Sequence, residues 1–540
     1  NVLAVSGMQV GFVVVALIFF FRSIRVTEPW RTVLVILSVF FYATLTGNHS
    51  PVFRAAIMAA LILAAPLLQR RIDPLNILSL AALVILLNNP LQLFMTGFQL
   101  SFMACLGMLL LYQRFRALAA SWYEKSWLQH RPARYLLDLF LISLAAQLAT
   151  LPLLLYYFYN LPIIAVFANL VVIPLTGVVM GLGFLLVALA WLPAWLVGPL
   201  AGGIDALVRF WVAWIHFFAQ LPGSHWSVPR PSWIVIWIMM FLLGLFVYWQ
   251  NERAAKRILV ICILLVNLYV WQHALQDPWR LRVTFFDVGQ GDACLFEFPD
   301  GQVLLVDGGD RTGKIDYGER VIVPYLLRNG IYYIENILIT HPHADHLGGI
   351  PYIMEHIRVG RILTSPFSFE DSLSQQIRSL AQSRQVALSC IKRGDIVNEY
   401  PHTCLYVLHP DTGQVVVDAG QSNDLSVVVK LVFGRCSFLL TGDAGCDPES
   451  QWLQRWDDSM LASDVIKVAH HGSATASSKE FCDHAAATFA VVSVGRQNRF
   501  ALPSQEVIER WQEQGATVCR TDEEGAVVFT SNGYDLARTY

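Results

Sequence analysis

The chain has 540 residues, a mean hydropathy of +0.50 and 14% charged residues, which excludes both a single small domain and an ordinary soluble protein. Soluble domains carry about 25% charged residues. Charge then divides the chain, because residues 1–276 hold 16 basic and 6 acidic residues, whereas residues 277–540 hold 22 and 34. We therefore predict a membrane domain over residues 1–276 and a water-soluble domain over residues 277–540.

Ten hydrophobic stretches recur in the first region. They cover roughly residues 2–21, 32–47, 52–69, 75–95, 97–113, 135–158, 162–190, 192–219, 232–250 and 258–275. A membrane-spanning helix needs about 20 apolar residues, so we expect nine or ten spans, with residues 162–219 as the ambiguous part. Pro174, Gly177, Gly181 and Gly183 could break a helix there, which is tolerated where the backbone is buried or lines a water-filled path. The chain begins inside an apolar run, and we expect further sequence upstream of it.

Basic residues cluster in alternate loops of this region. They are Arg22, Arg25 and Arg31; Arg70 and Arg71; Arg114, Arg116, Lys125, Arg131 and Arg134; and Arg253, Lys256 and Arg257. Basic loops stay on the cytoplasmic side. The span that starts at residue 258 would then place the water-soluble domain outside the cytoplasm.

Several polar residues interrupt the apolar stretches, namely Gln9, Gln99, Gln147, Asn169, Asp205 and Arg209. Polar groups inside a membrane are candidates for a transport pathway. They also serve as hydrogen-bonding links between helices, and Asp205 and Arg209, four residues apart, could simply pair. The sequence leaves both interpretations open.

After Trp279 the pattern changes to short strands separated by turns. Strands are expected in RVTFFDV, ACLFEF, QVLLVD, ENILIT, SVVVKLVF, SFLLTGD, VIKVAHHG and FAVVSV, and helices at 318–329, 347–357 and 504–515. This alternation indicates a layered α/β domain. The nine cysteines include no CxxC pair, which argues against a disulfide scaffold and a thiolate zinc site.

The clearest chemical motif directly follows the strand ENILIT. His341, His343, Asp345 and His346 stand within six residues. Two imidazoles at i and i+2 of an extended segment can meet at one ion, and the adjacent Asp-His pair can serve a second. Such ligands suit Zn²⁺, Mn²⁺ or Fe. The alternative is a solvated surface loop, which the preceding strand and the following Gly348-Gly349 disfavour.

Motifs throughout the chain resemble those of the ComEC competence proteins, channels implicated in moving one DNA strand across the bacterial inner membrane. They are LAVSGMQV, GFQLSF, AQLATLPLLLYYF and ANLVVIPLTG in the membrane region, and FFDVGQGDA, VDGG, ITHPHADHLGG and KVAHHGS in the soluble one. The family usually has His at the position of Gln9 and an OB-like domain before the residue numbered 1 here. The resemblance implies a polytopic α-helical membrane domain followed by a metallo-β-lactamase-like αββα sandwich.

The resemblance also implies a site for one or two divalent ions, Mn or Zn. His341 and His343 match ligands of the first ion, Asp345 and His346 match ligands of the second, and Asp443 matches the bridging carboxylate. His470 or His471 matches the last imidazole, and the sequence does not decide which is the ligand and which contacts substrate. Catalytic roles would fall to Asp345 and His471, and supporting roles to Asp287, Asp292 and Asp307.

Two departures from the family's pattern bear on activity. Many hydrolases of the fold have a further His between HxHxDH and the bridging Asp, but His356, His402 and His409 stand in no suitable setting here. Asn423 and Ser426 occupy that region and, with Asn498, are candidate substrate-binding residues. Leu502 stands where the family generally has a His. The first difference implies a first site that either favours Mn²⁺ over Zn²⁺ or binds its ion weakly. The second implies reduced activity if the family's His binds phosphate.

Two bound ions would lower the pKa of a bridging water and stabilise the oxygens of a phosphodiester. Three hypotheses follow: a single-stranded DNA channel with a nuclease-like domain, a membrane-anchored phosphodiesterase of other substrates, and a channel with a silent hydrolase domain. The acidic soluble region argues against a nucleic-acid partner, although the ions, Lys467, Arg496 and Arg499 would add positive charge. Expected partners are single-stranded DNA, membrane lipid and other DNA-uptake proteins. One of these must supply energy, because the chain has no Walker A motif.

Overall fold

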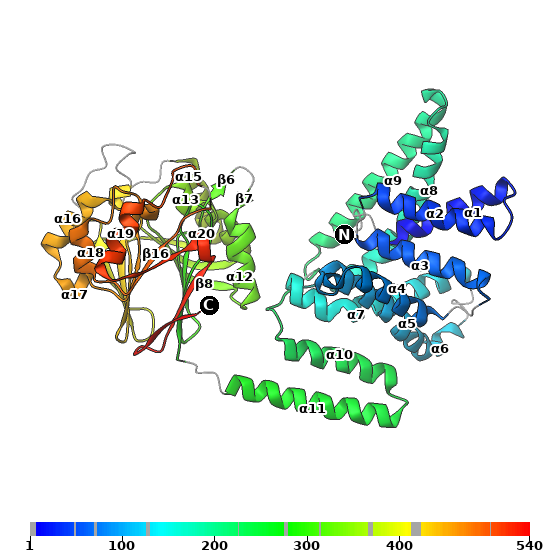
Figure 1. Ribbon diagram of the computed structural model, residues 1–540, viewed down its shortest axis with the longest axis horizontal. Helices are drawn as coiled ribbons and strands as arrows, with labels where there is room; N and C mark the ends of the chain where they lie inside the picture. Colours follow the sequence, from blue (N-terminus) through cyan, green and yellow to red (C-terminus); the bar gives the residue numbers. More distant parts are fainter. Residues whose placement is uncertain are drawn as a thin grey trace. The chain divides into compact units, whose positions relative to one another are not determined.

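The computed structural model describes residues 7–47, 50–69, 73–125, 130–224, 226–274, 279–312, 315–365, 371–411, 423–496 and 498–539 (Figure 1). The chain separates into two compact units, Asn1–Ala274 and Leu275–Tyr540. The predicted boundary at 276/277 and the basic pair Arg70 and Arg71 lie outside the described residues.

The first unit is helical, and ten apolar helices occupy the ten predicted hydrophobic stretches. They are α1 (Gly7–Ser23), α2 (Trp30–Leu45), α3 (Ser50–Leu67), α4 (Pro74–Asn88), α5 (Thr96–Leu118), α7 (Arg131–Phe158), α8 (Ala165–Leu189), α9 (Ala194–Gln220), α10 (Trp233–Tyr248) and α11 (Glu252–Ala274). Five of these ten, α5, α7, α8, α9 and α11, are long and apolar enough to cross a membrane. The count of nine or ten spans stays a prediction.

The expected break near Pro174 is absent from the described residues, because α8 continues through this proline to Leu189. Gly177 instead allows a close helix contact: a Cβ atom there would lie 2.8 Å from the ring of Phe12. Small residues bring helices together in the same way elsewhere in the unit. The glycine therefore favours packing between α1 and α8 rather than a helix break.

Two of the polar residues in the spans link backbone and side chains within the unit. Gln99 donates to the carbonyl of Leu93 and accepts from the hydroxyl of Tyr157, both at 2.9 Å. Gln147 donates to the carbonyl of Pro162. Asp205 and Arg209 form an exposed pair at 2.7 Å within α9. The hydrogen bonds and the ion pair of these four residues agree with a role in packing within the unit, and they do not require a transport pathway.

The second unit contains two large sheets. The eight-stranded sheet has the order β10-β9-β8-β5-β4-β3-β18-β19, and the seven-stranded sheet has the order β11-β12-β13-β14-β15-β16-β17. The strands of the first sheet are β3 (Leu281–Phe285), β4 (Cys294–Glu297), β5 (Val303–Val306), β8 (Tyr333–Ile339), β9 (Arg358–Thr364), β10 (Ala387–Cys390), β18 (Val527–Ser531) and β19 (Leu536–Thr539). Those of the second are β11 (Ile396–Val397), β12 (Thr403–His409), β13 (Val428–Phe433), β14 (Cys436–Leu440), β15 (Val465–Lys467), β16 (Phe489–Val492) and β17 (Thr517–Arg520).

Three apolar clusters hold these sheets and their helices in four layers (Figure 1). Phe296 from the first sheet meets Phe438 from the second at 5.8 Å between ring centroids, within the cluster between the sheets. The second cluster packs α12 (Val323–Arg328), α14 (Ile350–His356) and α15 (Ser372–Arg384) on the first sheet. The third packs α16 (Cys446–Arg455), α18 (Lys479–Ala485) and α19 (Gln505–Gln514) on the other sheet. The αββα sandwich is therefore confirmed.

Some predicted elements differ in detail. The helix expected over 318–329 begins as a wider π turn, Gly318–Ile322, before α12. The polar helix α15 was not expected; it is capped by Asp371, whose carboxylate accepts from the backbone N–H groups of Leu373 and Ser374. All nine cysteines are free, in agreement with the absence of a disulfide pattern.

Candidate metal centre

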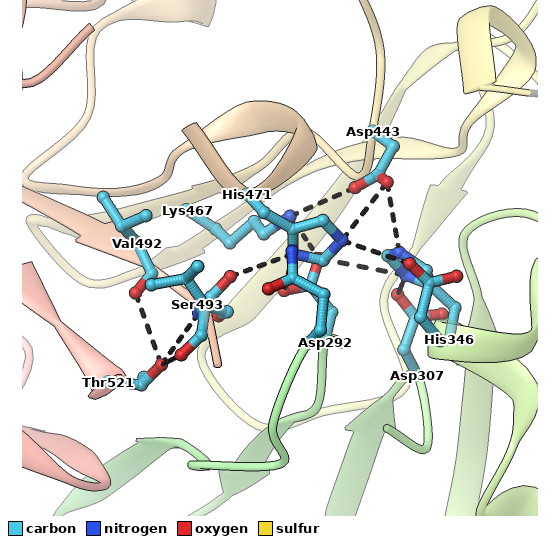
Figure 2. Close-up of polar contacts among 12 residues, drawn as sticks. Asp292, Asp307, His346, Asp443, Lys467, His471, Val492, Ser493 and Thr521 are labelled. Atoms are coloured by element: carbon cyan, nitrogen blue, oxygen red, sulfur yellow. Dashed lines mark hydrogen bonds and ion pairs between the residues drawn. The ribbon is translucent and has the colours of Figure 1, made fainter. Parts of the chain in front are cut away.

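The candidate ligands follow the carboxyl ends of strands from both sheets. Asp307 follows β5, His341 follows β8, Asp443 follows β14 and His471 follows β15. The β5–β8 pair is parallel, and so is the β14–β15 pair. Because parallel strands end at one edge of a sheet, residues that are far apart in the chain meet at a single site (Figure 2).

One oxygen of Asp443 is the geometric centre of the site. Asp443 Oδ2 lies 3.4 Å from Nε2 of His346 and 3.4 Å from Nε2 of His471. Nε2 of His471 also lies 3.4 Å from Oδ2 of Asp345. Ligand atoms about 2.1 Å from a tetrahedral Zn²⁺ are separated by about 3.4 Å. Each of these three pairs of atoms therefore has the spacing of two ligands at one metal ion.

A second group of nitrogen atoms lies beside this one. Nε2 of His341 is 3.2 Å from Nδ1 of His343 and 3.8 Å from Asp443 Oδ2. The structure thus brings together all four residues of the HxHxDH motif with Asp443. The second group offers three ligand atoms, two nitrogens and the shared oxygen, whereas the first offers four.

Asp307 fixes the orientation of two histidines. Its carboxylate accepts from the backbone N–H of Thr340 at 2.9 Å, from the Thr340 hydroxyl at 2.7 Å and from Nδ1 of His346 at 2.8 Å. The same Thr340 oxygen lies 3.1 Å from Nδ1 of His341 and can accept its proton. Nε2 of both imidazoles is thereby left as an acceptor facing Asp443, the arrangement that metal-binding histidines require.

The adjacent histidines His470 and His471 have different surroundings. Nδ1 of His471 donates to the carbonyl of Ser493 at 2.9 Å, which directs its Nε2 to the cluster. His470 faces Asn423 and Thr475, with 3.5 Å from its Nε2 to Nδ2 of Asn423. Both histidines have a positive φ, 50° and 54°, a conformation that is costly for residues other than glycine and that is typical of functional sites.

An open pocket of about 320 Å³ adjoins Asp443. Its lining includes Asn423, His470 and Thr475 and the acidic residues Asp424 and Asp447. Asp345, whose side chain is 32% exposed, is the most accessible of the residues around Asp443 Oδ2. The open pocket therefore reaches Asp443, although the side chain of Asp443 itself is buried.

Asp292 and Lys467 complete the cluster on its interior side (Figure 2). Asp292, His346, Asp443 and His471 each offer one ligand atom within 4.8 Å of the others. Asp292, however, approaches the Nδ1 atoms of His346 and His471, at 3.8 Å each, rather than their Nε2 atoms. Lys467 pairs with Asp292 and is only 4% exposed. The expectation that Lys467 adds positive charge for DNA is therefore wrong, because its ammonium is buried against carboxylates.

The electrostatics of the site follow from burial and close carboxylates. Burial lowers the pKa of His471, but Asp443, Asp292 and Asp345 outweigh it and raise that pKa to about 10. Burial likewise lowers the pKa of Lys467, and Asp292 and Asp443 bring it above its ordinary value. By contrast, burial and the neighbouring His346 hold the pKa of His341 well below its ordinary range. The carboxylates thus impose a strong preference for positive charge at the His471 side.

Other predicted site residues have structural contacts. The amide of Asn498 makes four hydrogen bonds within its turn, to Gly495, Phe500 and twice to Leu502, so it holds the turn instead of facing substrate. The Ser426 hydroxyl accepts from the backbone N–H of Asp443 at 3.1 Å. Asp287 is exposed and approaches the backbone N–H of Gly289.

None of the three spare histidines joins the cluster within the described part of the chain. His409 is buried, with its Nε2 donating to the carbonyl of Asp424 at 2.8 Å. His356 stacks on Tyr352, and His402 contacts Trp279. The departure from the three-histidine first site therefore stands.

The donor set fits divalent ions. Nε2 of His346 and Nε2 of His471 are buried and have no hydrogen-bond partner among the described residues, and the buried oxygens of Asp292 and Oδ1 of Asp443 have ion-pair contacts only. Buried polar atoms without such partners are rare in folded proteins. Two histidine nitrogens aimed at a shared carboxylate are satisfied by a cation, and the mixture of imidazole and carboxylate suits transition metals.

Comparison with known proteins agrees with both units. Residues 2–253 match the family model described as competence protein, and residues 286–486 match that of the metallo-β-lactamase superfamily. ComE operon protein 3 of Bacillus subtilis is 27% identical over 98% of this chain and 67% of its own length. Competence protein ComA of Neisseria gonorrhoeae is 24% identical over 98% of this chain and 70% of its own.

Among solved structures, the diiron β-hydroxylase CmlA from Streptomyces venezuelae is 14% identical, with a TM-score of 0.32 over 49% of this chain and 55% of its own. The matched families cover the helical unit and most of the sandwich, in the order that the sequence motifs predict. The chain thus joins a region similar to competence proteins, residues 2–253, to a metallo-β-lactamase domain over residues 286–486.

Proposed function

We propose that the chain forms part of a channel for single-stranded DNA in the bacterial inner membrane. We further propose that its C-terminal unit is a metal-dependent phosphodiesterase that acts on this DNA outside the cytoplasm. One observation carries the enzymatic part: Asp443 Oδ2 lies between the Nε2 atoms of His346 and His471 at metal-ligand spacing. The match of residues 2–253 to the competence-protein model supports the DNA-handling part.

In this proposal His341, His343 and Asp443 hold the first ion, and Asp345, His346, Asp443 and His471 hold the second, which is bound more tightly. The ions, Mn²⁺ or Zn²⁺, would activate a water and neutralise charge on the phosphodiester. The lower number of protein ligands at the first ion favours Mn²⁺, which accepts water and oxygen ligands readily. His471, not His470, is the ligand because its Nδ1 bond to Ser493 directs Nε2 inward.

The protein's own groups would position the substrate. His470 and Asn423 line the pocket beside Asp443 and offer neutral hydrogen-bonding groups to a phosphate oxygen. Asp345 is partly exposed beside His471 and would accept the proton released by the attacking water. Asn498 is occupied by its own turn, and Leu502 replaces the family's histidine. Slow turnover is therefore expected.

The decisive assay incubates labelled single-stranded oligonucleotide with the Mn²⁺-loaded full-length protein. We expect cleavage that Asp345→Ala reduces at least tenfold to a hundredfold, the range typical of disturbed metal sites. Equal cleavage by both proteins would mean a contaminating nuclease. No cleavage by either would support the silent-domain hypothesis, and cleavage of other phosphodiesters alone would support the membrane-anchored phosphodiesterase.

The extracytoplasmic location of the C-terminal unit rests on the basic loops of the helical unit. A reporter enzyme fused after Trp279 tests it: activity of a periplasmic reporter is expected, and activity of a cytoplasmic reporter alone would reverse the orientation. Since the sequence contains no phosphate-binding loop for ATP, we also expect a separate energy-supplying partner in DNA transport.

A further inference from the structure

Lys467 is an unusual residue at the end of a buried strand. It closes β15, is 4% exposed, and ends beside two carboxylates of the candidate metal centre. Its ammonium pairs with Asp292 Oδ2, lies 3.5 Å from Asp443 Oδ1 and donates to the carbonyl of Gly442 at 3.0 Å. A lysine so completely buried is found only with such partners.

The two oxygens of the Asp443 carboxylate have different neighbours. Oδ1 faces Lys467, whereas Oδ2 faces the Nε2 atoms of His346 and His471 (Figure 2). One oxygen is thus paired with a fixed protein cation, and the other is the atom at metal-ligand spacing. Without the ammonium, Asp443 would be free to rotate and present both oxygens to an ion.

Lys467 lies on the side of the cluster away from substrate. The cavity beside it measures about 20 Å³ and is lined by Asp292, Asp307 and Thr340 among buried apolar residues. That volume suits a single water molecule. The open pocket, by contrast, is lined by residues that do not include Lys467. Direct contact between this ammonium and a DNA phosphate is therefore excluded by its position.

Asp292 completes the arrangement from the same side. Its two oxygens lie 3.8 Å from Nδ1 of His346 and 3.8 Å from Nδ1 of His471, behind the metal-facing atoms. Those Nδ1 atoms already have closer acceptors in Asp307 and the Ser493 carbonyl. The closest partner of Asp292 is Lys467, so this carboxylate holds the ammonium against Asp443.

We propose that Lys467 is a positioning residue that reserves one oxygen of Asp443 for the metal ions by binding the other, and that Asp292 holds Lys467 in place. This role rests on the proposed metal centre and not on the nuclease activity. It accounts for a charged residue in an otherwise apolar strand and for the acidic residue of the GQGD turn, neither of which has a ligand position facing the pocket.

Loss of the Lys467 charge and loss of the Asp443 orientation have opposite expected effects on metal affinity, so the two effects can be separated by experiment. Removing a cation beside a metal site strengthens metal binding electrostatically, whereas loss of orientation weakens it. The double substitution Lys467→Met with Asp292→Asn removes one charge of each sign, so the net charge of the site is unchanged, and Asp443 keeps His346 and His471 as neighbours of its Oδ2. Any change in affinity then reports the orientation of Asp443.

The matched control is Lys430→Met. Lys430 is the other buried lysine of the same sheet, 5% exposed, and its ammonium donates to the carbonyls of Ser459 and Ala462 rather than to the metal centre. This substitution removes a buried ammonium from β13, which is separated from β15 by β14, but leaves Asp443 untouched. It therefore separates a general effect of losing a buried lysine from an effect on the site.

The experiment measures Mn²⁺ binding to the full-length protein in detergent, by the electron paramagnetic resonance signal of unbound Mn²⁺, with circular dichroism as a check on folding. We expect the double variant to bind Mn²⁺ tenfold to a hundredfold more weakly than the wild type, the range for lost support of a metal ligand, and Lys430→Met to bind within about twofold of it. Wild-type affinity in a folded double variant would overturn the role of Lys467. Absence of Mn²⁺ binding by the wild type would overturn the metal centre itself, and this role with it.

If the double variant does not fold, Asp292→Asn alone keeps the test open. Here Lys467 retains Asp443 Oδ1 and the Gly442 carbonyl but loses the partner that holds it in place. We expect the Mn²⁺ affinity of this single variant to lie between the affinities of the wild type and the double variant. An unchanged affinity would contradict the role assigned to Asp292.

Discussion

The two units of this chain differ in which side chains they expose and which they bury. In the helical unit large apolar residues face outward, with Leu87 at 76% and Trp191 at 80% exposure, and the Asp205–Arg209 pair is exposed too. In the sandwich the exterior is polar, whereas Asp443 and His346 are almost completely buried. A membrane accounts for the first pattern. The second has no such explanation, since burying charge is costly unless a partner compensates for it. Buried charge in the sandwich therefore marks the candidate metal centre.

The largest effect should come from the carboxylate at the centre of the site. Asp443→Asn removes the oxygen shared by His346 and His471, and we expect more than a hundredfold loss of Mn²⁺ affinity, beyond the range for outer support groups. Asp205→Asn, which removes an exposed carboxylate from the helical unit, is the control and should leave affinity unchanged. Metal analysis of both purified proteins measures the difference. Similar metal contents would break the comparison between the two units.

A smaller effect is expected from the carboxylate that orients the histidines. Asp307→Asn weakens the bonds to Thr340 and Nδ1 of His346, so it should reduce metal affinity about tenfold to a hundredfold. Asp287→Asn offers an exposed aspartate of a neighbouring turn as the control and should change affinity less than twofold. Calorimetric titration with Zn²⁺ gives both constants. Equal effects would show that burial of Asp307 has no particular importance for the ions.

In the helical unit, packing rather than charge should decide stability. A Cβ atom at Gly107 would collide with Ala149 and lie 2.7 Å from the carbonyl of Ala145, whereas Gly181 has no atom within 4 Å of that position. Gly107→Leu should therefore destabilise the contact between α5 and α7 by about 1–3 kcal/mol, with little effect from Gly181→Leu. Thermal unfolding in detergent compares the two. Greater destabilisation by the Gly181 variant would contradict this packing.

The smallest effect concerns pH and a buried histidine outside the centre. Burial lowers the pKa of His409 to about 4, against about 6.5 in an unfolded chain. Between these values the unfolded state binds a proton that the folded state does not, so stability falls as the pH falls. At pH 5 the contribution is about 2 kcal/mol.

His409→Gln keeps a donor for the Asp424 carbonyl but does not titrate. We expect its stability to fall less than that of the wild type between pH 7 and pH 5, by about 2 kcal/mol. Denaturant unfolding of the C-terminal unit at both pH values measures this difference. Parallel losses in the two proteins would mean that His409 is not buried in its neutral form.

Much of this architecture could be predicted from the sequence because its signals are local. Hydropathy located the ten apolar helices, and the HxHxDH motif located one loop of the candidate metal centre. The choice between His470 and His471 could not be made, because it depends on a carbonyl of Ser493, a backbone atom with no sequence signature. Thr340 was missed for a related reason: its hydroxyl connects His341 to Asp307 only after β5 and β8 pair.

Lys467 shows the same limit from the opposite side. From the sequence alone, a lysine close to a His-His motif is expected to be a surface charge. Lys467 is buried only because the GQGD turn, β14 and β15 come together around it. The prediction of a helix break at Pro174 was wrong, because neighbouring helices in a packed unit can accommodate a proline within a helix. Contacts between distant segments decide each of these cases.

The central claim is that the buried cluster around Asp443 binds divalent metal. Anomalous X-ray diffraction from crystals of the Mn²⁺-loaded protein, collected at the manganese edge, tests it most directly. We predict a peak about 2.0–2.3 Å from His346 Nε2, His471 Nε2 and Asp443 Oδ2, with a weaker second peak beside His341 and His343. Absence of anomalous density at Asp443, with Mn²⁺ present at millimolar concentration, would contradict the account.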